Sequence, residues 1–282
     1  MTHRYYWAKI KPMKIKSLLQ PWLLILVSGI LLFLFTQQAL IITANPNYFP
    51  TLILLGSFVV PVAFVTYFYD YVRHREISMP LLTTCFVVGG ILGSIAAGVL
   101  ESAALTNSSL VTMFGIGTIE ELAKLVFPVA MYSGWRYRHE ADGLLFGVAA
   151  GMGFAGLETM GYAMVTLFET QGDITSLQQV LFLRGLLSPA GHAAWTGFFC
   201  AVLWSEREKK GRAVINGKII GAFLMVVVLH SLWNLAASFG GQASADVIST
   251  GGTSVLVVVS LTLLIRRYKE AKKALNNTAI QS

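Results

Sequence analysis

The sequence predicts an all-α fold, a polytopic membrane helix bundle of about eight transmembrane helices with both termini in the cytoplasm. Hydrophobic residues make up 55% of the 282 residues and charged residues only 12%, whereas a soluble domain carries about 25% charged residues. Eight apolar stretches are each long enough for a helix that crosses the bilayer. Basic residues occur in alternate connecting segments. These observations leave no room for a soluble domain.

The predicted spans follow one another with short connections. The first stretch exceeds the roughly 7–15 apolar residues of a signal peptide and lacks a convincing cleavage site, so it is interpreted as a retained anchor. We divide the chain into a basic tail at 1–20, a membrane domain at 21–265 and a second basic tail at 266–282. The eight spans lie at residues 21–43, 51–69, 81–104, 110–132, 141–168, 178–204, 217–239 and 245–265.

The net charge of +7 is explained by where the basic residues lie. Apart from Lys124 and Arg184, they fall in the two tails and in the loops around residues 73–75, 136–138 and 207–218, while the intervening loops contain none. This is the positive-inside pattern of a membrane protein. It predicts that the tails and the basic loops are cytoplasmic, with the lipid bilayer as the surrounding phase, and no nucleic-acid partner is expected.

Several ionisable side chains nevertheless lie well inside predicted spans. One charged residue at a helix centre costs about 2.5–3.5 kcal/mol, so such residues usually face the interior of a bundle or a water-filled cavity. Their joint occurrence predicts a hydrated site within the membrane. The residues are Glu120, Glu121, Lys124, Glu158, Arg184, His192 and His230.

The fourth span contains GTIEELAKLVFPVAMY at residues 117–132. At about 100° per residue, Glu120, Glu121 and Lys124 lie within one arc of a helix and form a polar stripe. A lysine beside carboxylates inside a span is most often their neutralising partner. Lys124 is therefore expected to give electrostatic support to Glu120 or Glu121.

The fifth span carries Gly143, Gly147 and Gly151 at four-residue spacing. Such a face of small residues lets another helix approach closely. Glu158 continues roughly the same face, so its side chain is expected to point at protein rather than at lipid.

The sixth and seventh spans each contain one buried histidine. His192 follows Pro189, which breaks the helical hydrogen-bond ladder one turn earlier, and His230 lies one turn before Asn234. With alternating topology and a rise of 1.5 Å per residue, Glu120, Glu158 and both histidines come out roughly 14–21 Å below the external surface. Arg184, nearer the outer end of its span, can reach the interface.

Two histidines and three glutamates in one layer supply the groups needed to activate water. A glutamate can accept a proton from water. Histidine and asparagine side chains can stabilise the oxyanion that forms when hydroxide attacks an amide carbonyl. The layer therefore favours hydrolysis of a peptide bond.

Four short segments resemble, in order, the motifs of the PrsW family of intramembrane proteases, relatives of the type II CAAX-prenyl endopeptidases and the Abi proteins. They are EELAK at 120–124, FAGLE at 154–158, PAGHA at 189–193 and HSLWN at 230–234, and the similarity covers about residues 110–239. In the wider superfamily the first motif commonly ends in arginine and the second in histidine, and this chain has Lys124 and Glu158 there, as the PrsW branch does.

The resemblance implies a glutamate-dependent protease without a cofactor. Glu120, with Glu121 beside it, would activate water, His192 would help to hold that water, and His230 and Asn234 would form the oxyanion site. Glu158 is counted with the catalytic residues, although the relatives outside the PrsW branch, whose mechanism is better understood, commonly carry histidine there. The family is associated with membrane-anchored regulators, so the implied partner is a membrane-anchored protein substrate such as an anti-sigma factor.

Other functions stay open at this point. Glu158, His192 and His230 could supply three ligands to zinc with a fourth position for water, although the HExxH spacing of common zinc proteases is absent. Intramembrane glutamate, histidine and lysine also suit a transporter or proton relay. Spans one to three, however, hold no counterpart to the deep ionisable residues. An inactive scaffold would keep the glycine face but would not need Glu120 with His192.

Overall fold

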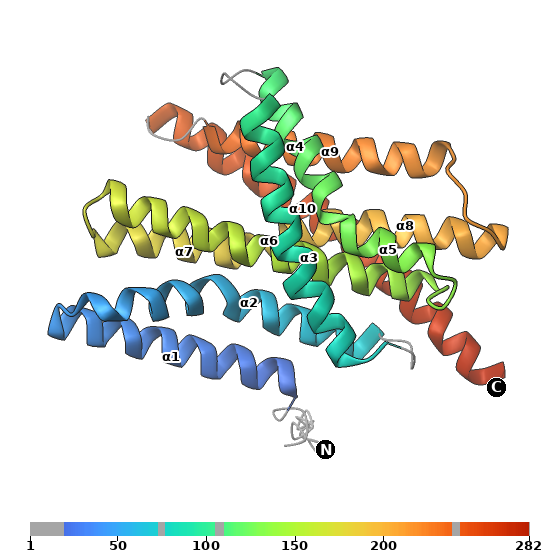
Figure 1. Cartoon of the computed structure of the whole chain (residues 1–282), viewed down its shortest axis with the longest axis horizontal. Coiled ribbons are helices and arrows are strands. Elements are labelled where there is room, and N and C mark those ends of the chain that lie inside the picture. Colours follow the sequence, from blue (N-terminus) through green and yellow to red (C-terminus); the bar gives the residue numbers. More distant parts are fainter. Residues whose placement is uncertain (1–19, 73–76, 105–109, 239–242, 282) are drawn as a thin grey trace, which may run out of the picture.

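The computed structural model describes residues 20–72, 77–104, 110–238 and 243–281. The predicted N-terminal basic tail and the basic residues at 73–75 fall almost entirely outside these ranges. The described residues form helices and no strand, which confirms the all-α bundle. The helices are α1 (Pro21–Thr43), α2 (Phe49–Val72), α3 (Met79–Ala104), α4 (Leu110–Lys124), α5 (Val126–Ser133), α6 (Glu140–Glu169), α7 (Ile174–Leu187), the π-helical turn η3 (Pro189–Ala193), α8 (Ala194–Lys210), α9 (Gly217–Ser238) and α10 (Ala243–Gln281) (Figure 1).

Within the described ranges, seven helical segments are long and apolar enough to cross a membrane, one fewer than the sequence predicts. The missing one is the stretch 110–132, which is divided into α4 and α5 at Leu125. Pro128 explains the division, because a proline has no amide hydrogen and its ring crowds the carbonyl of the residue four positions earlier, here Lys124. The amide of Leu125 instead bonds the carbonyl of Leu122 at 3.1 Å. The EELAK motif therefore forms the last turn of α4.

A second proline shapes the segment that carries His192. After Pro189 the chain makes the π-helical turn η3 before α8 begins, and the amide of Ala193 reaches back five residues to the carbonyl of Ser188 at 3.4 Å. Such π-helical turns are frequent at functional sites. The predicted break in the ladder is thus confirmed, and α7, η3 and α8 together form one segment from Ile174 to Lys210 that counts as a single candidate span.

The central helix of the bundle is α6, in which every residue from Ala141 to Gly156 is buried. Its predicted glycine face packs on α8 and η3. A Cβ atom at Gly147 would lie 2.5 Å from the carbonyl oxygen of Thr196, and one at Gly151 would collide with the carbonyl of His192. The glycines therefore let the backbone of α6 approach η3, as the spacing predicts.

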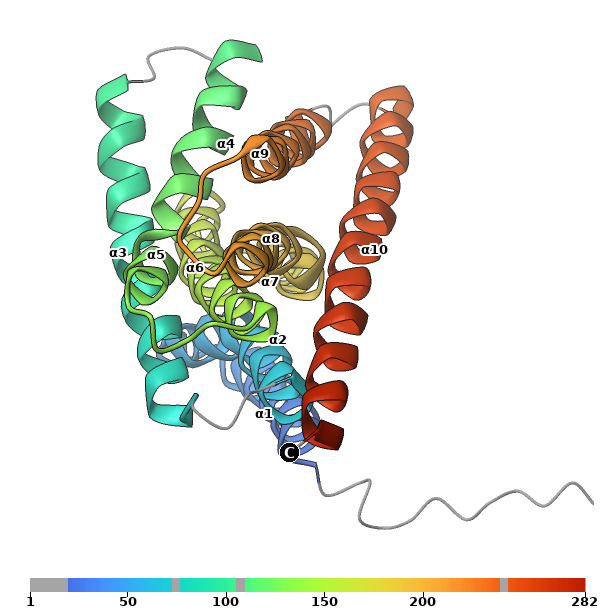
Figure 2. The same cartoon turned by 90° about the vertical axis from the view of Figure 1, so that its right-hand side faces the viewer.

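The other helices surround α6. Figure 2 shows α3 and α10 on opposite sides of the bundle, with the remaining helices between them. The sequence places the boundary between the membrane domain and the C-terminal tail between residues 265 and 266. The helix α10 has no break there and continues to Gln281.

The described ends of the predicted cytoplasmic segments gather at one end of the bundle (Figure 1). The phenol of Tyr71, at the end of α2, donates a hydrogen bond to Gln20 at 2.7 Å and lies under the ammonium group of Lys272. Arg267 forms an ion pair with Glu140 at 3.2 Å, at the start of α6. These contacts place the N-terminal end of α1, the end of α2, the start of α6 and the C-terminal part of α10 together, as the charge pattern requires.

Reporter fusions test which side of the membrane this end faces. A fusion at Arg136 is expected to report the cytoplasm and a fusion at Gln171, between α6 and α7, the external side, because the basic loops stay inside. A second pair of fusions provides an independent test, with an external signal expected at Asn45 and a cytoplasmic signal expected at Arg212. A cytoplasmic signal at Gln171 together with an external signal at Arg136 would show that the bundle has the opposite orientation.

Candidate active site

The last turn of α4 holds two carboxylates around one buried cation. The ammonium nitrogen of Lys124 lies 3.2 Å from Oε2 of Glu120 and 2.7 Å from Oε1 of Glu121, and its side chain is 0% exposed. The ammonium group also lies over the ring of Phe154, 4.4 Å from the ring centre. Lys124 thus pairs with both glutamates, which confirms the expected partnership.

Replacement of Lys124 by methionine is expected to destabilise the bundle, because it leaves two buried carboxylates without their cation. Removing one partner of a buried ion pair costs about 3–5 kcal/mol. Lys218→Met, on a side chain that is 74% exposed, is the matched control. Thermal unfolding in detergent should show a lower midpoint for Lys124→Met and an unchanged midpoint for Lys218→Met, and equal midpoints would show that the pairing is not a source of stability.

His230 on α9 faces the same pair of glutamates. Its Nδ1 lies 2.9 Å from Oε1 of Glu121, and its Nε2 lies 3.5 Å from Oε2 of Glu120. The indole of Trp195 stacks on the imidazole with 4.8 Å between ring centres. The hydroxyl of Thr196 donates to the other oxygen of Glu121 at 3.4 Å. Glu121 is therefore held by Lys124, His230 and Thr196, whereas the described contacts of Glu120 involve only its Oε2.

Glu158 on α6 makes two contacts of its own. Its Oε1 lies 2.8 Å from a guanidinium nitrogen of Arg184, and its Oε2 lies 3.1 Å from Nε2 of His192. The guanidinium group of Arg184 lies over Tyr162, 3.9 Å from the ring centre. Arg184 is thus turned into the protein toward Glu158, a partner that the sequence does not predict.

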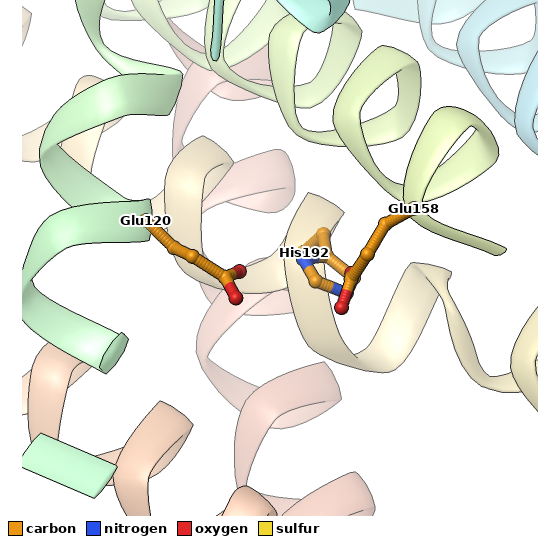
Figure 3. Close-up of side chains that lie close together, drawn as sticks. All are labelled: Glu120, Glu158 and His192. Atoms are coloured by element: carbon orange, nitrogen blue, oxygen red, sulfur yellow. The ribbon is translucent and has the colours of Figure 1, made fainter. Parts of the chain in front are cut away.

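The two groups of carboxylates meet at His192. Figure 3 shows Glu120 from α4 and Glu158 from α6 approaching the imidazole from opposite sides. One potential ligand atom from each of Glu120, Glu158 and His192 lies within 4.8 Å of the other two. The Nδ1 atom of His192 is buried and has no hydrogen-bond partner among the described residues. The arrangement can hold a water molecule or a cation between two carboxylates and an imidazole.

A family model for the PrsW family of intramembrane metalloproteases matches residues 78–265, well over half of the chain. The chain belongs to the PrsW family. It is therefore a multi-pass integral membrane peptidase that acts on a membrane-embedded protein substrate. No curated protein and no solved structure gives a significant match.

The match is wider than the four motifs that carry the resemblance, since it begins at the start of α3 and ends within α10. It thus includes Glu101, an acid outside the four motifs. Glu101 lies near the end of α3, and its buried Oε1 has no hydrogen-bond partner in the described chain. Glu101 was not among the site residues expected from the sequence, and it adds one acid of the third predicted span to the ionisable groups of the bundle. An acid in the last turn of an otherwise apolar span is the signal that could have revealed it.

Thr196 is a second residue of the site that was not expected from the sequence. A threonine inside a membrane helix is common, and its partner, Glu121, lies on another helix.

Asn234 is the one predicted site residue that the described contacts leave outside the cluster. It lies one turn after His230 on α9, is partly buried, and makes no side-chain hydrogen bond among the described residues. Trp195 packs as expected, with its indole donating to Ser260 at 2.9 Å.

The metalloprotease description of the PrsW family can be tested against the residues present. Two carboxylates and one imidazole are ligands that zinc accepts in catalytic sites, with a further position for water. The three atoms within 4.8 Å of one another, together with the unpartnered nitrogen of His192, fit such an ion. The alternative ligand set expected from the sequence is Glu158, His192 and His230, whereas the potential ligand atoms that lie within 4.8 Å of one another belong to Glu120, Glu158 and His192. The imidazole of His230 is directed at Glu121.

Proposed function

We propose that this protein is an intramembrane endopeptidase in which Glu120 activates a water molecule for attack on a peptide bond of a membrane-anchored protein. The observation that carries the proposal is the convergence of Glu120, Glu158 and His192 inside the bundle, with potential ligand atoms within 4.8 Å of one another. The peptidase activity itself is inferred from membership of the PrsW family. The geometry supports a particular division of roles.

Glu120 is a better candidate for the base than Glu121. Glu121 is occupied by Lys124, His230 and Thr196, whereas Glu120 faces His192 across the shared space (Figure 3). In the proposed step Glu120 takes a proton from water while the water oxygen bonds to the substrate carbonyl carbon. The carbon–nitrogen bond then breaks, and the proton passes from Glu120 to the leaving amine.

His192 and Glu158 have different roles in this scheme. His192 holds the water opposite Glu120. Glu158 is a positioning residue, because its carboxylate contacts Nε2 of His192 at 3.1 Å and is itself held by Arg184 at 2.8 Å. Fixing the imidazole in this way lowers the cost of orienting the water.

The oxyanion that forms on the substrate carbonyl is assigned to His230 and Asn234. His230 lies beside Glu120 and Glu121, with 5.9 Å between its ring centre and that of His192. Asn234 follows it by one helical turn and therefore shares its face of α9. Side-chain donors of these two types stabilise developing oxyanions in hydrolases.

A second candidate mechanism uses a divalent metal, and the family description together with the cluster of Glu120, Glu158 and His192 favours it. These three side chains would hold the ion. When bound, the ion would polarise the substrate carbonyl and make water more acidic. The roles of Lys124 and Arg184 would be unchanged, since each neutralises a carboxylate of the cluster.

Chelation separates the two mechanisms. Purified protein in liposomes is expected to keep its activity on a single-pass substrate after exhaustive treatment with a chelator, because Glu120 alone supplies the base. Metal content measured on the same sample provides the control for complete removal. Loss of activity on removal of a stoichiometric metal, restored by adding Zn²⁺, would establish the metal mechanism instead.

The substrate is proposed only by its chemistry, a protein segment anchored in the same bilayer. The resemblance points to anti-sigma factors as one group of such proteins, and that assignment stays a prediction. Cleavage of a panel of single-pass proteins by the purified enzyme, with product mass measured for each, tests it.

A further inference from the structure

A cavity of about 640 Å³ lies beside the proposed catalytic residues, between α7, α9 and α10. His192 and Arg184 form part of its wall, so the cavity reaches the site directly. None of the roles assigned above uses its remaining wall. Figure 2 shows α10 along the outer side of the bundle, and six residues of this helix line the cavity.

The wall of this cavity combines Arg184 and two leucines of α7 with hydroxyl and valine side chains of α10. On α7 it includes Leu183, which is 56% exposed at the surface. On α10 it includes four hydroxyl side chains, Ser249, Thr250, Thr253 and Ser254. Their spacing of one, three and four residues places these hydroxyl groups on one face of the helix.

The rim of the cavity is directed to lipid. Val258 of α10 and Leu183 of α7 both line the cavity and are 65% and 56% exposed. Exposed apolar side chains on a membrane-spanning helix face hydrocarbon. A ligand that enters between α7 and α10 therefore comes from the bilayer.

The volume limits what can enter. A transmembrane helix of about 20 residues is roughly 30 Å long and 10 Å wide, which corresponds to about 2,400 Å³. The cavity thus holds only a few residues of such a helix. An intact helix also keeps its carbonyl groups in its own hydrogen bonds, so the segment that reaches His192 must be unwound.

Unwinding inside a membrane requires new hydrogen-bond partners. Each unsatisfied backbone group in hydrocarbon costs several kcal/mol. A serine or threonine hydroxyl both donates and accepts, and the hydroxyl face of α10 places four of them in the wall of the cavity that also contains His192. The hydroxyl of Ser254 already donates to the carbonyl of Thr250 at 2.7 Å but can still accept a hydrogen bond.

We propose that the hydroxyl face of α10 (Ser249, Thr250, Thr253 and Ser254) is the binding site for an unwound segment of the substrate's transmembrane helix, which enters from the bilayer between α7 and α10. The inference rests on the proposed function, since it places the cleaved bond beside His192. It adds the route of entry and the residues that determine which segments are accepted. Segments that unwind easily, such as those containing glycine or proline, are preferred.

A bulky residue in the cavity tests this site kinetically. Thr253→Trp fills the space beside the hydroxyl face and is expected to raise KM for a single-pass substrate about tenfold or more. The matched control is Thr262→Trp on the same helix. Thr262 is exposed, bonds the carbonyl of Val258 in its own helix at 2.7 Å, and does not line the cavity. Equal KM values for the two variants at matched folded protein would overturn the proposal.

A cross-linking experiment in the Glu120→Gln background separates binding from cleavage. A photoreactive side chain at Val258, in the cavity wall, is expected to capture the substrate. The same group at Val255, which is similarly exposed (63% against 65%) but does not line the cavity, is expected to capture lipid. Equal capture of substrate at both positions, or capture of phospholipid alone at Val258, would overturn the proposal. Continued cleavage by the Glu120→Gln protein would instead contradict the proposed function and leave the capture result valid.

Discussion

Glu120→Gln is expected to lower the rate of peptide cleavage by about 10²–10⁴-fold, the usual contribution of a general base. Glutamine keeps the size of the side chain but cannot accept a proton from water. Its carbonyl oxygen can still accept a hydrogen bond from Lys124, whose other carboxylate partner, Glu121, lies at 2.7 Å. The folded bundle should therefore persist. Cleavage of a single-pass substrate by purified protein in liposomes measures the effect.

The control for this prediction is Glu169→Gln, at the exposed end of α6. It changes the same type of side chain far from the cluster and should leave the rate within about twofold of the parent rate, as expected of a surface substitution. Thermal unfolding of both variants verifies that equal amounts of folded protein are compared. A Glu120→Gln variant that cleaves at the parent rate would remove Glu120 from the catalytic mechanism.

His192→Ala is expected to have the second large effect, also about 10²–10⁴-fold on the rate. The change removes the imidazole that stands between Glu120 and Glu158 (Figure 3) and leaves Glu158 with Arg184 as its remaining partner. His139→Ala is the matched control, because the side chain of that histidine is 39% exposed and contacts Glu208 near the end of α8, outside the cluster. Equal rates for the two variants would exclude His192 from the site.

The convergence of the site could be predicted from the sequence because lipid restricts where polar groups can point. Glu120, Glu158, His192 and His230 lie on four different spans, and each must face protein or water. Alternating topology then fixes their depth. The structure brings all four together, and the glycine face of α6 packs on the segment that carries His192, as the spacing predicts.

The details that the sequence could not supply depend on how each helix is rotated and where it ends. The pairing of Arg184 with Glu158 follows from the relative orientation of α6 and α7, which residue spacing does not fix. Glu101 lies at the end of a predicted span, where the sequence suggests the interface between membrane and water. Pro128 indicates a division near Leu125, but the length of the apolar stretch favours an unbroken span.

The hydroxyl face of α10 could not be recognised from the sequence for a different reason. Serine and threonine can bond their own helix, as the hydroxyl of Ser254 does with the carbonyl of Thr250 at 2.7 Å. In a sequence they are therefore compatible with any membrane helix. Only the cavity between α7 and α10 gives these residues a distinct position next to the site.

The central claim is that Glu120 and His192 act on the same water molecule, and a double variant tests it most directly. Residues that act as one catalytic unit have strongly non-additive effects, so removing both costs about as much as removing one. In single-turnover cleavage, Glu120→Gln combined with His192→Ala is expected to be no more than about tenfold slower than the slower single variant. A double variant whose loss equals the product of the two single losses would show that the residues act independently, and would contradict a shared water.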